Sequence, residues 1–349
     1  MRTIKIGNRE ISEDSSTFII AEISANHGND INIVKKMISE AKKIGADAIK
    51  MQTYTPDTIT IDCNNEYFQI DKGTLWDGRT LYDLYKEAYM PWEWHEELFN
   101  YAREIGIICF STPFDFTAVD LLESLDVPAY KIASFEITDI PLIEYAASKG
   151  KPMIISTGIA TIQEIQEAVE ACRRVNNNEI ILLKCTSAYP AQLEDMNLKT
   201  IPNLADTFDV ISGLSDHSLG LVAPMGAVAL GARVIEKHFI LDKSIGGPDS
   251  TFSLDINEFK EMIEGVRNIE KALGKVDYSL SAKTLKNREF SRSLFIVEDV
   301  KAGEVLTSEN VRSIRPANGL APKYYNDVLG KKFNADYKKG TPLKLELIK

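Results

Sequence analysis

The sequence predicts an α/β fold, a (β/α)8 TIM barrel followed by a small C-terminal, mostly β domain. From residue 18 onward, short continuous apolar runs alternate with amphipathic segments, as expected for strands buried on both faces and separated by helices. Eight such runs precede residue 240, which is the number that closes a parallel barrel. After about residue 275 this rhythm ends, and short β-prone runs broken by Gly and Pro follow. We therefore assign residues 1–280 to the barrel and 281–349 to a linker and the small domain.

The expected strands are short and carry few charges. They cover residues 18–24, 46–54, 107–114, 129–134, 152–158, 180–187, 210–216 and 232–239. Two helices have clear start signals, because Thr161 with Glu164 and Asp255 with Glu258 have the spacing of a capping box. Residues 55–93 form a long aromatic insertion after the second strand, and long loops in compact domains are usually functional.

The composition is that of an ordinary globular protein, with 44% hydrophobic and 26% charged residues. A formal net charge of −11 argues against binding to nucleic acid or an anionic membrane surface, since both need a basic protein surface. The N-terminus lacks the apolar core of a secretion signal, and no run is long enough to span a membrane. We therefore expect a cytoplasmic protein.

Two of the four histidines, His217 and His238, stand at the ends of the last two expected strands. Catalytic groups of barrel enzymes lie at the C-terminal ends of the strands, so these two imidazoles should meet at the barrel mouth. Neutral imidazoles suit Mn, Co or Zn, with water and substrate oxygens completing the coordination. The alternatives are a structural pair or an acid/base pair without metal. His95 is expected on the surface.

Two lysines, Lys50 and Lys131, lie within apolar strands, where an unpaired charge is costly to bury. Together with Ser134, Ser156 and Ser215 they could hold a phosphate and a carboxylate. Two alternatives remain open at this point. The lysines could form salt bridges with Glu22, Glu136 or Glu236, or one of them could be the Schiff-base nucleophile of an aldolase.

Ordered motifs along nearly the whole chain resemble the sialic acid synthase family. They are FIIAEISANHG, GADAIKMQTY, CFSTPFD, YKIASFEITDIPLI, ISTGIAT, KCTSAYP, GLSDHSLG and ALGARVIEKHF, followed by NREFSRSL and RPANGLAPK in the tail. The resemblance implies an enzyme that condenses phosphoenolpyruvate with an N-acylated amino sugar, giving a nonulosonic acid and phosphate. The tail is similar to the small antifreeze-like domain of this family.

The resemblance also implies roles for individual residues. His217 and His238 would bind a divalent metal, most often Mn²⁺ in the family, with Co²⁺ or Mg²⁺ as alternatives. The expected ligands of phosphoenolpyruvate are Lys50, Lys131, Ser134, Ser156 and Ser215, and those of the sugar are Glu22, Tyr189 and Asp249. Ser187 stands where relatives often have Asn, so its contact with substrate is not carried over directly. Glu22 is the favoured acid/base residue, with Glu136 as the second choice. Arg315 would enter the barrel of a partner subunit, which implies a domain-swapped homodimer.

Within the family, two features resemble the pseudaminic acid branch. Phe135-Glu136 follows KIAS where the sialic branch commonly has Gly-Asp, and the insertion contains LWDGRTLYDLYKEAYMPWEWH. An aromatic lining suits a 6-deoxy sugar with a second acetamido group better than a sugar with a hydroxymethyl group. N-acetylneuraminate and legionaminic acid synthases with the same mechanism are the alternatives.

Overall fold

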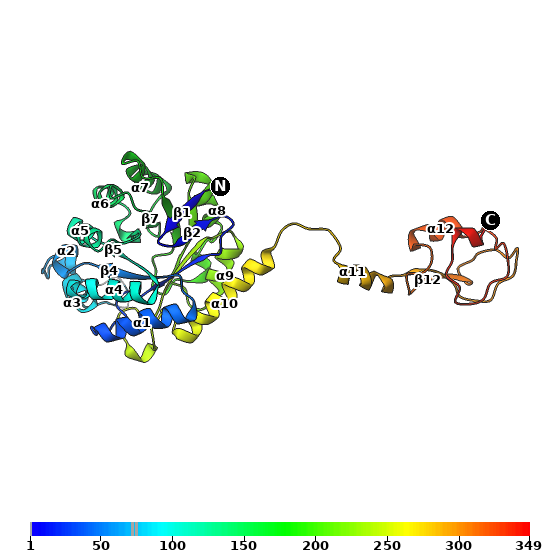
Figure 1. Ribbon diagram of the computed structural model, residues 1–349, viewed down its shortest axis with the longest axis horizontal. Coiled ribbons are helices and arrows are strands. Elements are labelled where there is room, and N and C mark those ends of the chain that lie inside the picture. The colour runs from blue at the N-terminus through cyan, green and yellow to red at the C-terminus, as the bar shows by residue number, and fades with distance from the viewer. Residues whose placement is uncertain (1, 71–72, 74–75) are drawn as a thin grey trace. The chain divides into compact units, whose positions relative to one another are not determined.

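The chain folds into two compact units, residues 1–274 and 275–349 (Figure 1). The structure, a computed structural model, describes residues 2–70, 73 and 76–349. Each unit has its own hydrophobic core.

The first unit is a closed barrel of eight parallel strands, which confirms the predicted fold class. The strands are β3 (Phe18–Glu22), β4 (Ala48–Thr53), β5 (Ile108–Pro113), β6 (Tyr130–Ile132), β7 (Met153–Ser156), β8 (Ile180–Cys185), β9 (Ile211–Asp216) and β10 (Val234–His238). Each strand pairs with the next along the chain, and β10 closes the barrel against β3. The strand that His217 follows, β9, and the strand that His238 ends, β10, are therefore neighbours, as their order in the sequence suggested.

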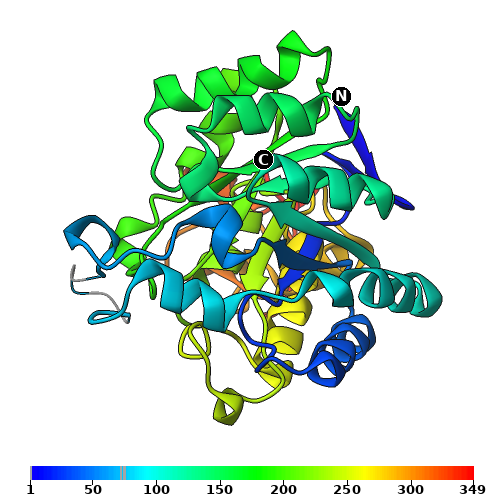
Figure 2. The same ribbon diagram turned by 90° about the vertical axis from the view of Figure 1, so that its left-hand side faces the viewer.

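Helices ring the strands (Figure 2). They are α1 (Ile31–Ile44), α4 (His95–Ile105), α5 (Phe116–Ser124), α6 (Ile140–Ala147), α7 (Ile162–Arg174), α8 (Thr200–Phe208), α9 (Val222–Ala229) and α10 (Ile256–Leu273). Both predicted capping boxes are present, at Thr161 with Glu164 and at Asp255 with Glu258. The apolar helix faces pack on the outward-facing side chains of the strands and form the main core.

A hairpin that the sequence did not predict precedes the barrel. Strands β1 (Thr3–Ile6) and β2 (Arg9–Ser12) pair antiparallel. Their buried residues Ile4, Ile6 and Ile11 join a core cluster with Phe18 and Ile20 of the first barrel strand. The hairpin therefore covers the end of the barrel at which the strands begin, and leaves the opposite end for chemistry.

The barrel interior changes from apolar to polar along the strands. Side chains alternate between the two faces of a strand, so every second residue points inward. Inward positions near the strand starts are apolar, such as Ile20 on β3 and Ala48 on β4. Two residues further along, the same strands place Glu22 and Lys50 inward, and these two charged side chains are in contact. Two residues along each strand thus separate the apolar, packed end of the barrel interior from a layer of charged side chains.

The long insertion after β4 is only partly a loop. It contains the helices α2 (Pro56–Ile59) and α3 (Leu81–Ala88), while part of the segment, residues 71–72 and 74–75, lies outside the described residues. Thr80 caps α3 by accepting a hydrogen bond from the Asp83 amide. The segment also supplies aromatic side chains, including Tyr85 on α3 and Trp76 before it.

The second unit contains α11 (Ala282–Asn287), the antiparallel strands β11 (Ser293–Ile296) and β12 (Val311–Ile314), and α12 (Tyr325–Val328). Several single bridge pairings extend its sheet-like structure, and Leu294, Val311 and Phe333 lie at its core. Across both units, none of the described helices is long and apolar enough to cross a lipid bilayer.

Candidate active site

A network of two lysines and two glutamates fills the upper barrel. Lys50 Nζ lies 2.5 Å from Glu22 Oε2 and 3.4 Å from Glu236 Oε1, and Lys131 Nζ lies 3.9 Å from the same Glu236 oxygen. All four side chains are buried. The salt-bridge alternative therefore holds for Glu22 and Glu236. Because positive and negative charges balance, the network can accept an anion only by redistributing these contacts.

The charge network shifts the ionisation of its members. Burial raises the pKa of Glu22 to about 7, with Glu236 adding to the rise and Lys50 opposing it. Burial also favours the neutral form of Glu236, but Lys131 and Lys50 hold its pKa below the ordinary value. Burial lowers the pKa of Lys131. Glu22 is thus the carboxyl group of the network that can gain or lose a proton near neutral pH.

Three serine hydroxyl groups belong to the same region of the barrel mouth. Lys131 Nζ donates a 2.7 Å hydrogen bond to Ser156 Oγ, and Ser215 Oγ donates to Glu236 Oε1 at 3.3 Å. Ser134 Oγ accepts a 3.1 Å hydrogen bond from the Gly158 amide. The structure thus brings the predicted anion ligands together, with a strand-end amide that the sequence reasoning missed.

Gly158 is required here by space. A Cβ atom at this position would lie 2.1 Å from Ser187 Oγ and 2.6 Å from Ser134 Oγ. We therefore predict that Gly158→Ala displaces both hydroxyls and raises KM for an anionic substrate bound here about tenfold or more, which corresponds to the loss of one good hydrogen bond. Steady-state kinetics measure the effect. Gly106→Ala is a poor control because of its positive φ, whereas Ala160→Gly, just beyond the site, should leave KM unchanged.

The two predicted histidines meet beside this network. The ring centroids of His217 and His238 are 5.3 Å apart. His217 Nδ1 is 3.1 Å from the Thr186 carbonyl oxygen, which leaves Nε2 for another partner. His238 Nδ1 is buried without a hydrogen bond and lies 3.7 Å from Asp249 Oδ2. Burial lowers the pKa of His238 well below its ordinary value, so its imidazole is neutral.

These features fit a metal with few protein ligands. In the part of the chain that the structure describes, no group of three His, Cys, Asp or Glu side chains is arranged to hold a metal ion. Two imidazoles, one of them neutral with a buried unpaired nitrogen, can nevertheless supply two ligands, with water and substrate oxygens in the remaining positions. Asp249 Oδ2 lies 3.7 Å from the same His238 nitrogen, so its carboxylate borders this candidate ligand.

Aromatic side chains form a wall beside the histidines. The Tyr189 ring lies 4.5 Å from that of His217, 5.3 Å from Phe252 and 5.9 Å from Trp76 of the insertion. Neither Phe252 nor Trp76 was among the residues predicted for the site. The aromatic composition of the insertion was a signal for Trp76. The contact between Trp76 and Tyr189 could not be predicted before the fold was known.

Glu136 and its neighbour Phe135 differ in exposure, since Glu136 is half-buried and Phe135 is exposed. Glu136 follows β6 at the barrel mouth, and burial raises its pKa to about 7 although Lys131 opposes the rise. It can therefore take part in proton transfer. Phe135, which we expected to line an apolar site, is instead 58% exposed.

The remaining predicted residues lie elsewhere. Arg315 follows β12 in the second unit, so the structure of the first unit alone does not bring it to the site. His95, which we expected on the surface, is fully buried, and its ring nitrogens contact Thr53 Oγ1 and the Pro91 carbonyl oxygen. That prediction was wrong because α4 begins at His95 and turns the ring toward the barrel.

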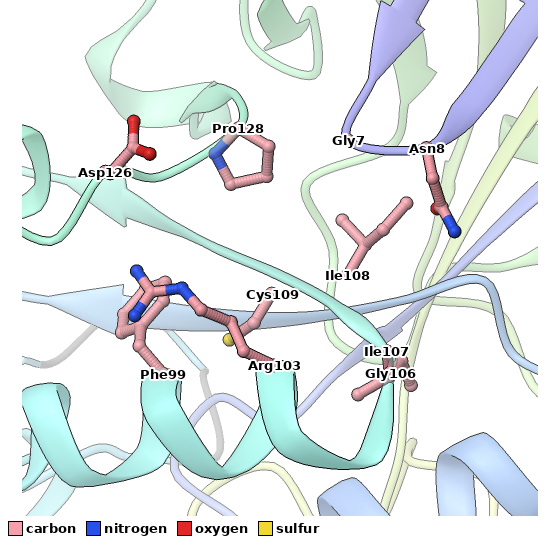
Figure 3. Close-up of a pocket in the computed structure, with 10 residues that line it drawn as sticks. All are labelled: Gly7, Asn8, Phe99, Arg103, Gly106, Ile107, Ile108, Cys109, Asp126 and Pro128. Atoms are coloured by element: carbon pink, nitrogen blue, oxygen red, sulfur yellow. The ribbon is translucent and has the colours of Figure 1, made fainter.

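A hollow of about 280 Å³ lies at the opposite end of the barrel (Figure 3). It is lined by the hairpin turn at Gly7 and Asn8, by Arg103 of α4, and by Ile108 at the start of β5. None of the residues discussed above for catalysis lines it. The residues discussed for catalysis lie instead at the C-terminal ends of the strands.

A closed parallel barrel with paired lysines, titratable carboxyls and two imidazoles at its mouth defines a barrel enzyme that handles an anionic substrate. The comparisons with known proteins identify its kind. Residues 37–278 match the NeuB family and residues 291–349 match the SAF domain, and the chain belongs to the NeuB family.

The chain is similar to known proteins over nearly its whole length. It is 52% identical to a pseudaminic acid synthase of Campylobacter jejuni over 98% of both chains, and 50% identical to that of Helicobacter pylori over 93% of this chain and 96% of the relative. The crystal structure of a sialic acid synthetase from Leptospira borgpetersenii has a TM-score of 0.73 and 33% identity, covering 82% of this chain and 95% of the other. These similarities confirm the family resemblance.

Proposed function

We propose that this chain is a pseudaminic acid synthase. It condenses phosphoenolpyruvate with 2,4-diacetamido-2,4,6-trideoxy-β-L-altrose to give pseudaminic acid and phosphate. The observation that carries the proposal is the 52% identity to a pseudaminic acid synthase over nearly the whole chain. The N,N'-diacetyllegionaminic acid synthases are less similar, with 38% identity for that of Legionella pneumophila.

Lys131 and its hydroxyl neighbours bind phosphoenolpyruvate in this proposal. Lys131 and Ser156 already form a hydrogen bond, and the Gly158 amide points to the same region through Ser134. An incoming phosphate or carboxylate would accept hydrogen bonds from these donors. Lys50 remains tied to Glu22 and Glu236, so it supplies positive charge without leaving the barrel interior.

Bond formation joins C3 of phosphoenolpyruvate to the aldehyde carbon of the open-chain sugar, and the aldehyde oxygen takes up a proton. Water adds at C2 and gives its proton to Glu22, whose pKa of about 7 suits a general base. Cleavage of the bond between C2 and the phosphate-bearing oxygen then releases phosphate, which takes up the proton of the C2 hydroxyl group as the ketone forms. Glu136, with a similar pKa, is the second candidate for proton transfer.

His217 and His238 would hold a divalent metal, Mn²⁺ above all, and a bound metal would supply Lewis-acid polarisation of the aldehyde. Tyr189 and the aromatic wall would place the deoxy carbon and acetamido methyl groups of the sugar against apolar surface, while Asp249 would accept a hydrogen bond from a sugar hydroxyl. Each of these side chains thus has a separate task in positioning the aldehyde.

The direct test is a product assay. The enzyme is incubated with phosphoenolpyruvate, Mn²⁺ and each of three amino sugars, the precursors of pseudaminic, legionaminic and N-acetylneuraminic acid, and phosphate release and product mass are measured. We expect phosphate release with the first sugar at the highest kcat/KM. Preference for another precursor would assign the chain to that activity. A covalent adduct after borohydride treatment would instead favour the Schiff-base aldolase.

The active form would be a domain-swapped homodimer in which Arg315 of one chain completes the site of the other. Residues 275–349 contain 15 Lys and Arg against 9 Asp and Glu, a formal charge of +6, so residues 1–274 carry −17. Opposite charges favour association of the two kinds of unit. Exposed apolar side chains also follow several barrel strands at their C-terminal ends; they are Phe116, Phe135, Ile159, Ile162, Leu193, Leu219 and Val222. The protein would act in the cytoplasm.

We predict that Arg315→Ala lowers kcat at least about tenfold, because an arginine that contacts the substrate is lost. Arg312→Ala, at an exposed arginine on the preceding strand β12, should have little effect. Mixing the Arg315→Ala chain with an inactive Glu22→Gln chain tests the exchange between subunits. In a mixed dimer, the barrel of the Arg315→Ala chain keeps Glu22 and receives Arg315 from the Glu22→Gln chain. Activity should therefore reappear. If unmixed and mixed samples are equally inactive although mixed dimers form, Arg315 does not act across subunits.

A further inference from the structure

A buried ion pair lies outside the barrel, directly beside the two histidines. Lys237 Nζ is 2.5 Å from Asp216 Oδ2, and both side chains are completely buried. The two residues are register partners on β10 and β9. Their neighbours Glu236 and His238 point into the barrel, so Lys237 points outward, like Ile235, which belongs to the core between strands and helices.

A charged pair in this apolar layer is hard to explain by stability. Removing two charges from water costs more than the pair usually regains, and apolar residues of similar volume are often as stable. The charged groups of the catalytic network lie on the other face of the same strands. The pair therefore needs a reason other than packing or contact with substrate.

The hydrogen bonds of the pair supply that reason. Lys237 Nζ also donates a 2.6 Å hydrogen bond to the Ser218 carbonyl oxygen, and Asp216 Oδ1 accepts a 2.9 Å bond from the Ser218 amide. Asp216 and Ser218 are the two chain neighbours of His217, and Lys237 is the chain neighbour of His238. The ammonium group of the residue next to His238 thus contacts the Asp216 carboxylate before His217 and the Ser218 carbonyl group after it.

We propose that Lys237 is a positioning residue that, through Asp216 and the Ser218 carbonyl group, fixes the distance and orientation between the imidazoles of His217 and His238. One of its tests, the measurement of Mn²⁺ affinity, rests on the proposed function. The β9 strand ends at Asp216, so His217 already belongs to the following loop. The cross-strand ties give this loop residue the rigidity that a two-histidine metal site needs.

The experiment compares four variants with the wild-type chain. Lys237→Met and Asp216→Asn each break the pair, and the double variant Asp216→Leu/Lys237→Met replaces it by apolar side chains. Asp47→Asn is the matched control, because Asp47 is a largely buried, ion-paired carboxylate that lies before β4, at the other end of the barrel. Melting temperature, Mn²⁺ dissociation constant, kcat and the imidazole NMR signals of metal-free protein are measured for each.

The single variants should melt at lower temperature, whereas the double variant should recover most of that loss. All three should bind Mn²⁺ about 10-fold to 100-fold more weakly, as expected when support of a metal ligand is lost. The NMR signals of His217 and His238 should move, while those of His27 and His95, the other two histidines, stay in place. Asp47→Asn should lower only the melting temperature.

A double variant with wild-type Mn²⁺ affinity, kcat and histidine signals would overturn the inference and leave the pair a purely structural role. If the wild-type chain binds no Mn²⁺, the proposed metal role fails, but the histidine signals of the metal-free variants still decide whether Lys237 positions the two rings. Movement confined to the expected pair would then support the positioning role, and unchanged signals would refute it.

Discussion

Turnover should fall to background when a chelator removes divalent metal, and Mn²⁺ should restore it. The two imidazoles at the barrel mouth are the physical reason. His238 is neutral, and its buried Nδ1 has no hydrogen-bond partner, while His217 has one ring nitrogen engaged by the Thr186 carbonyl group. Without Lewis-acid polarisation of the aldehyde, several kcal/mol of transition-state stabilisation would be lost. Phosphate release at matched substrate concentrations measures the loss.

The control separates metal loss from unfolding. Circular dichroism of the chelated protein should keep the signal of the barrel, because an extensive apolar core between strands and helices holds it together. His238→Gln should remain inactive when Mn²⁺ is added back, whereas His95→Gln, at a buried histidine away from the site, should keep its response to Mn²⁺. Full activity in chelator, with the ion verified as absent, would contradict the metal role.

Replacement of Glu22 by Gln should lower kcat by about 10²-fold to 10⁴-fold, the range typical for loss of a general base. The substitution keeps the shape of the side chain and removes its charge next to Lys50. The barrel then has one negative charge fewer, so phosphoenolpyruvate should bind as well as before or better. A fall in kcat without a rise in KM is therefore the expected pattern.

The pH profile adds a second criterion. Because burial raises the pKa of Glu22 to about 7, the wild-type kcat should rise as pH increases through that value and the carboxylate forms. The variant should lack this part of the profile. Glu97→Gln, at an exposed ion pair with Lys35, is the matched control and should behave like the wild type. If the variant keeps both kcat and the rise with pH, the base is another group, with Glu136 as the next candidate.

The barrel could be predicted because its signals are local. Each strand is a continuous apolar run, and residues that are next to each other on one strand alternate between its faces whatever the neighbouring strands contain. The strand ends could therefore be located, and with them Lys131 and Ser156, which the structure joins by a hydrogen bond. The hairpin β1–β2 escaped prediction because its two strands are only four residues long and are buried through contact with the barrel base.

The tertiary structure decided which side chains from different segments contact each other. Glu236 was one of three carboxyls offered as partners for the lysines, and only the closed barrel places it between Lys50 and Lys131. Trp76 came to lie against Tyr189 across more than a hundred residues of chain.

The sequence by itself thus determined the fold class, the family and the set of polar residues at the strand ends. The tertiary structure decided how these residues pair, which carboxyl has a pKa near 7, and that Lys237 faces Asp216 rather than the substrate. The reason is physical. Periodicity along a strand depends on the pleat of one segment, whereas ion pairing and desolvation depend on distances between strands that only barrel closure sets.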